Sequence, residues 1–168
     1  MDMQDILEAM MEGASLGNHL FDKYKKEKKL QPLKRIDFLV TSKDAGKYRR
    51  LPSRISTVCQ GTILAREWVS LPPNDKKPEL FAQSIARLAR KESLKVTVLG
   101  ETELKQKKLG AILAVASGSR NKPRMVILEY NPVKAKKTIA FVGKGVTFDS
   151  GGINLKSTAS IADMKLSL

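Results

Sequence analysis

Several features common in secreted or membrane proteins are missing from this sequence. Cys59 is the only cysteine among 168 residues, so an internal disulfide is excluded and nothing indicates an oxidising compartment. The longest apolar runs, at residues 111–116 and 138–142, are far shorter than the roughly 20 residues that a membrane-spanning helix requires. The start, MDMQDILEAMMEG, lacks the basic and apolar regions of a secretory signal. These absences favour a cytoplasmic protein without a membrane partner.

Acidic residues are also scarce, with 17 against 31 lysines and arginines, which gives a formal net charge of +14. Such an excess fits an anionic partner, because neutralised phosphates release counterions. The lysine-rich segment 23–29 contains a single aromatic residue, Tyr24, so a solvated face is favoured over a nucleic-acid patch. A non-enzymatic nucleic-acid-binding protein is therefore kept as the alternative function, although no helix-turn-helix, zinc-finger or aromatic-rich RNA-binding motif supports it.

The hydrophobic fraction of 42% is sufficient for a folded core, and the apolar residues recur with helical spacing in three long segments. These segments predict helices over residues 2–24, over 53–69 and from Pro78 onward, the last with Leu80 facing inward, and a shorter helix is predicted over 101–109. Cys59 falls on the apolar stripe of the second helix, which predicts a buried, inert thiol. Residues 41–50 are charged and predict a loop.

Short apolar runs bounded by glycine, proline, asparagine or charged residues predict strands. The runs are at residues 35–40, 95–99, 111–116, 125–130 and 138–142. Alternating helices and continuous apolar strands predict an α/β fold in which helices cover both faces of the sheet.

One segment, residues 142–165, carries a pattern of residues that indicates a functional site. Lys144, Asp149 and Lys156 follow the last expected strand and alternate with glycines at 143, 145, 151 and 152. Loops beyond the carboxyl ends of strands form sites in open α/β sheets, and glycine lets a backbone approach a ligand closely. The plainer interpretation of Lys144 and Asp149 is that they form a surface ion pair. A phosphate-binding loop is disfavoured, because the G-x-x-x-x-G-K-[ST] order is missing and Asp149 would repel an anion.

The string GKGVTFDSGG followed by Lys156 resembles the signature of the leucyl aminopeptidase family, the dinuclear metallopeptidases of the M17 type. Weaker similarity extends through residues 65–68, 72–74 and 114–119. The resemblance implies a metal-dependent aminopeptidase that releases N-terminal, leucine-type residues from peptides by means of two Mn or Zn ions and an activated water. It also implies a partial mixed sheet flanked by helices, a cytoplasmic location and a homo-oligomer, a hexamer for the full-length family.

The same resemblance assigns roles to three residues. Lys144 corresponds to an amine ligand of one metal ion, Asp149 to a carboxylate that bridges both ions, and Lys156 to the catalytic lysine. An amine can bind a metal only when it is deprotonated, and a nearby divalent cation favours that form. A protonated Lys156 could stabilise the developing oxyanion. Phe148, beside Asp149, is expected either to pack beneath the metal loop or to join the core.

The sequence departs from the family pattern near its end. The next aspartate ligand is expected at position 167, where Ser167 stands, and Asp163 lies about one helical turn, or 5 to 6 Å, earlier. The remaining acidic ligands and the arginine associated with a catalytic bicarbonate are expected beyond Leu168. We therefore expect an incomplete fragment without turnover on its own. Residues 1–50 would form the end of an amino-terminal domain with a linking helix and strand, and residues 51–168 the first part of the catalytic domain.

Overall fold

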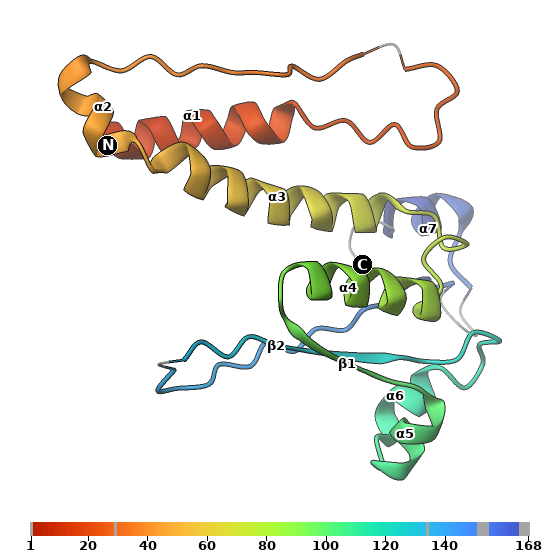
Figure 1. Cartoon of the computed structure of the whole chain (residues 1–168). Helices are drawn as coiled ribbons and strands as arrows, with labels where there is room; N and C mark the ends of the chain where they lie inside the picture. The colour runs from red at the N-terminus through yellow and green to blue at the C-terminus, as the bar shows by residue number, and fades with distance from the viewer. Residues whose placement is uncertain (1, 29, 134, 151–154, 165–168) are drawn as a thin grey trace. The chain divides into compact units, whose positions relative to one another are not determined.

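The computed structural model describes residues 2–28, 30–133, 135–150 and 155–164. The chain forms two compact units, Met1–Ser70 and Leu71–Leu168 (Figure 1). Among the described residues, no helix combines the length and apolar character needed to cross a membrane.

The first unit contains the helices α1 (Met3–Gly17), α2 (Ser42–Tyr48) and α3 (Leu51–Ser70). The backbone N–H of Asp2 donates to Asp5 Oδ2 at 3.2 Å and so helps to satisfy the start of α1. Helix α1 ends at Gly17, earlier than the predicted residue 24, and the side chain of the next residue, Asn18, bonds to the backbone of Leu33. Its amide nitrogen donates to the Leu33 carbonyl at 2.9 Å, and its amide oxygen accepts from the Leu33 N–H at 2.7 Å.

Helix α2 lies where the sequence predicted a charged loop, so that prediction was wrong. The Thr41 hydroxyl donates to Asp44 Oδ2 at 2.6 Å, and the Asp44 N–H donates to the Thr41 carbonyl at 3.0 Å. These bonds start the helix, and the burial of Tyr48 at its end gives it a tertiary anchor. A helix of seven residues is too short to show apolar periodicity, which explains why the sequence pattern missed it.

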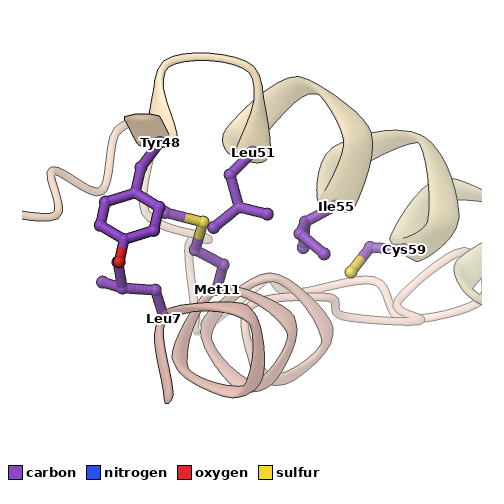
Figure 2. Close-up of a cluster of buried hydrophobic side chains, with 6 residues drawn as sticks. All are labelled: Leu7, Met11, Tyr48, Leu51, Ile55 and Cys59. Carbon is purple, nitrogen blue, oxygen red and sulfur yellow. The ribbon is translucent and has the colours of Figure 1, made fainter. Parts of the chain in front are cut away.

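The core of the first unit lies between α1, α2 and α3, as Figure 2 shows. Residues four positions apart share a helical face, so each long helix presents a stripe to its neighbour. Leu7 and Met11 of α1 face Leu51, Ile55 and Cys59 of α3. The predicted helix over 53–69 and the predicted burial of Cys59 are thereby confirmed.

The second unit begins with α4 (Pro78–Lys91), which confirms the helix predicted from Pro78. Proline at the first position of a helix sacrifices no hydrogen bond. Ala82, Ala86 and Ala89 form the buried stripe of α4, whereas Leu80, which was expected to face inward, is exposed. The helix ends where Ser93 adopts a φ of 56° and the Leu94 N–H donates to the Ala89 carbonyl at 2.8 Å.

Two strands follow, β1 (Lys95–Leu99) and β2 (Met125–Glu129), and they confirm two of the five predicted strands. They pair antiparallel, with Lys95 opposite Glu129 and Leu99 opposite Met125. The first of these pairs is charged, and Lys95 Nζ lies 2.8 Å from Glu129 Oε2. Helix α4 packs against both strands. The expected burial on both faces was wrong for this sheet, since Val98 and Leu128 are exposed.

The connection between the strands contains α5 (Glu101–Gln106) and α6 (Gly110–Val115). Helix α5 confirms the short helix predicted from residue 101, and its Leu104 is fully buried. The strand predicted at 111–116 was wrong, because α6 occupies that run. Two alanines in AILAV favour a helix, which a short apolar run cannot distinguish from a buried strand.

The strands predicted at 35–40 and 138–142 were also wrong for the structure described, where neither run has strand pairing. Apolar content favours an extended conformation but supplies no partner, and a strand needs the hydrogen bonds of a neighbouring strand. The fold class nevertheless stands: helices flank a small sheet in a mixed α/β arrangement.

Candidate metal and catalytic site

The segment singled out by its chemistry runs past α4 in the second unit. A Cβ atom added to Gly145 would lie 3.9 Å from Phe81 Cε1, an ordinary van der Waals distance, so this glycine passes close to the α4 aromatic ring. The Val146 N–H donates to the Lys144 carbonyl at 3.1 Å and makes a tight local turn. The contact with Phe81 was not anticipated from the sequence, because no spacing rule links residues so far apart.

The structure brings two of the three expected site residues together. Lys156 Nζ donates to Asp149 Oδ2 at 2.8 Å and forms an ion pair with it. The Lys156 side chain is only 19% exposed, whereas that of Asp149 is 46% exposed. This geometry corresponds to a short, charge-assisted hydrogen bond with its lysine largely withdrawn from water.

Local backbone contacts hold the lysine end of this pair. The Lys156 N–H donates to the Ser150 carbonyl at 2.9 Å, which ties Lys156 to the residue that follows Asp149. Helix α7 (Thr158–Met164) then begins, and Ser157 caps it by accepting the Ser160 N–H at 3.3 Å on its hydroxyl oxygen. Lys156 is therefore fixed from both directions along the chain.

Lys144 and Phe148 differ from Lys156 in their exposure to solvent. Lys144 is exposed, and no ion pair joins it to Asp149 or Lys156 among the residues that the structure describes. Phe148 is exposed as well, so the expectation that it packs beneath the loop or in the core was wrong. Ser167 lies outside the described residues, as does the side chain of Asp163.

The described residues supply the right types of donor for a divalent metal ion but only part of a donor set. Asp149 offers carboxylate oxygen and Lys144 offers an amine, whereas protein metal sites generally use roughly three or more protein ligands. No group of three or more His, Cys, Asp or Glu side chains that could together hold a metal ion occurs within residues 2–28, 30–133, 135–150 and 155–161. Lys144 and Asp149 alone therefore do not complete a metal site.

Comparison with known proteins gives independent evidence on the family of this chain. Residues 63–168, more than half of the chain, match the model of the cytosol aminopeptidase family, catalytic domain. The chain is 38% identical over 166 residues to a probable cytosol aminopeptidase of Desulfotalea psychrophila, and the match covers 96% of this chain and 33% of that protein. It is 42% identical over 155 residues to a probable cytosol aminopeptidase of Gluconobacter oxydans, covering 91% of this chain and 31% of the relative.

The chain is also similar to a solved structure. The bottromycin maturation enzyme BotP in complex with Mn superposes with a TM-score of 0.81 and 34% sequence identity, over 97% of this chain and 33% of that one. The chain thus spans about a third of the length of the relatives that it matches. Because the family model covers the GKGVTFDSGG motif together with the whole of the second unit, this chain belongs to the cytosol aminopeptidase family.

Proposed function

We propose that this chain provides the first part of the catalytic domain of a metal-dependent aminopeptidase, which releases N-terminal residues from peptides. The observation that carries the proposal is the contact between Asp149 and Lys156 within the loop of the family motif. Surface lysines and aspartates usually pair without consequence, but this pair joins the two residues to which the motif assigns metal binding and catalysis.

Lys144 and Asp149 would hold the metal ions. A metal ion bound there would polarise the scissile carbonyl and lower the pKa of a bound water. Lys156 would act differently, because its ammonium group is a fixed positive charge beside the loop. Such a charge is suited to stabilising the negative charge that develops on the carbonyl oxygen. The low exposure of the Lys156 side chain limits its alternative positions and so favours preorganisation.

Mn²⁺ is the first ion to test, because BotP, which is similar to this chain, was solved in complex with Mn. We expect the purified chain to bind Mn²⁺ weakly and Asp149→Asn to lower that affinity by about tenfold or more, since a carboxylate donor is lost. The concentration of free Mn²⁺ is measured by electron paramagnetic resonance. Asp37→Asn, which removes an exposed carboxylate from the first unit, is the matched control. Equal affinities for both variants would contradict the assignment of Asp149.

For the isolated 168-residue chain we propose that turnover is absent, since the described residues offer two donors. Hydrolysis of a leucine amide-type substrate is measured with Mn²⁺ or Zn²⁺ added. We expect no product above the buffer rate, and robust turnover that a chelator abolishes would overturn this part of the proposal.

The oligomeric state stays a prediction. The family resemblance implies a homo-oligomer, a hexamer for the full-length family, and sedimentation of a full-length relative would test it.

A further inference from the structure

We propose that the extended segment 35–40 pairs with the same segment of a second copy of this chain and forms an antiparallel two-stranded ribbon. The sequence predicts a strand here, and within the described residues no neighbouring strand pairs with it. A second copy supplies the missing partner. The surface lies wholly within the first unit and does not depend on the metal and catalytic site.

The first argument is that the segment is held at both ends with its backbone groups unpaired. The Asn18 side chain holds the Leu33 backbone by two hydrogen bonds, at 2.9 and 2.7 Å. At the other end, the Thr41 carbonyl accepts the Asp44 N–H at 3.0 Å as α2 begins. In the part of the chain that the structure describes, no hydrogen bond joins residues 35–40 to another backbone group. A row of such N–H and C=O groups is a template for a further strand.

The second argument is that the side chains alternate between core and solvent, as they do along a strand. Phe38 packs against the buried core of the first unit, whereas Leu39 is 95% exposed. Arg35 and Asp37 are both exposed, and Arg35 Nε lies 2.9 Å from Asp37 Oδ1. This ion pair places the two side chains on one side of the segment, as positions two apart on a strand require. The outward side therefore carries one positive charge, one negative charge and a leucine.

The third argument is that these charges are self-complementary in one register. Two copies paired antiparallel about Ile36 place Arg35 of each copy opposite Asp37 of the other, so opposite charges meet twice across the ribbon. Centring the pairing on Arg35 or on Asp37 places like charges directly opposite, which is destabilising. Centring it on Phe38 leaves both charges without an opposite charge. Charge complementarity therefore selects the register centred on Ile36.

The pairing is short, so the dimer is weak. In the register centred on Ile36, Pro32 faces Val40, and the ladder ends there because proline has no N–H to donate. An interface limited to these few residues is typical of transient complexes. The dimer is therefore expected to form only as the protein concentration rises.

Two variants that reverse a charge test the register. Asp37→Arg and Arg35→Asp each put like charges opposite one another in a homodimer, and each should weaken dimerisation by about tenfold, because two attractive pairs become repulsive. Mixed in equal amounts, the two variants again place opposite charges across the ribbon, so a heterodimer should form as tightly as the unchanged dimer. Glu27→Arg and Lys26→Asp change the net charge equally at exposed positions outside the segment and are the matched controls.

Sedimentation velocity over a concentration series measures dimerisation, and circular dichroism shows that each variant keeps its helical content. Weakening by both single variants, recovery in their mixture and no effect of the controls support the proposal. Amide hydrogen exchange within residues 34–38 should also slow as the dimer forms, and unchanged exchange overturns the pairing.

Three results of the sedimentation series overturn the proposal. A chain that stays monomeric at every concentration has no such interface. A mixture of the single variants that does not recover contradicts the register. A dimer that persists in both single variants but is lost in Phe141→Lys shows that association uses the exposed segment 138–142 instead.

Discussion

At the scale of single residues, Glu101 shows how local lysines alter a carboxylate. Lys105 Nζ lies 2.8 Å from its Oε1, and Lys122 Nζ lies 3.0 Å from its Oε2. Hydrogen bonds from Lys105 and then from Lys122 lower the pKa of Glu101 below the usual glutamate value, because they favour the charged form. Only the first contact, between residues four apart on α5, follows from the sequence.

This arrangement makes a pH-dependent prediction. A carboxyl group whose pKa is lower in the folded state than in the unfolded state stabilises the fold at pH values above the unfolded pKa. That contribution is lost as the pH falls through the folded pKa. Replacing both Lys105 and Lys122 by methionine should raise the pKa of Glu101 toward the ordinary value of about 4.3. An NMR titration of the Glu101 carboxyl carbon measures it, and an unchanged pKa would show that the two lysines do not act on it.

At the scale of elements, the first unit depends on the packing of α1 against α3. Ile55 is 2% exposed at the centre of the α3 stripe, whereas Val58 on the same helix is 54% exposed. Ile55→Ala should lower the free energy of unfolding by about 2 to 5 kcal/mol, because it removes buried apolar atoms and leaves a cavity. Val58→Ala should change it by less than about 1 kcal/mol. Urea unfolding followed by circular dichroism compares them, and similar losses would contradict the packing described.

The elements also separate what sequence patterns can predict from what they cannot. The helices α3 and α4 are long enough to show a repeating apolar stripe, and both were predicted with boundaries within two residues of their starts. The short apolar runs were ambiguous. The runs at 95–99 and 125–130 became β1 and β2 because they pair with each other, and the run at 111–116 became α6. Pairing is a non-local property, so local composition cannot decide it.

At the scale of the whole molecule, apolar surface remains exposed in the segment 138–142. Phe141 is 95% exposed, and Ile139 and Val142 lie beside it in the same state. Contiguous apolar surface without partners promotes association between chains. We expect Phe141→Lys to lower the light scattering of concentrated samples. Val133→Lys adds the same charge at a side chain that is fully exposed but outside the run, and should have a smaller effect. Equal reductions would show that net charge, not the apolar run, controls association.

The net charge of +14 is also a property of the whole molecule, and by itself it does not identify a partner. Nucleic-acid binding stays a prediction from charge alone. The comparisons instead assign the chain to a peptidase family. An electrophoretic shift assay at two salt concentrations would test the electrostatic alternative, since phosphate contacts weaken steeply with salt.

The sequence by itself determined the long helices, the burial of Cys59 and the family motif, because each depends on spacing along the chain that is visible without a fold. Tertiary structure decided which apolar runs became strands and that α2 forms around a buried Tyr48. It also decided that Lys156 contacts Asp149 while Lys144 stays exposed. These outcomes depend on which residues far apart in the sequence come into contact and on how far their side chains are removed from solvent. The order of residues alone specifies neither.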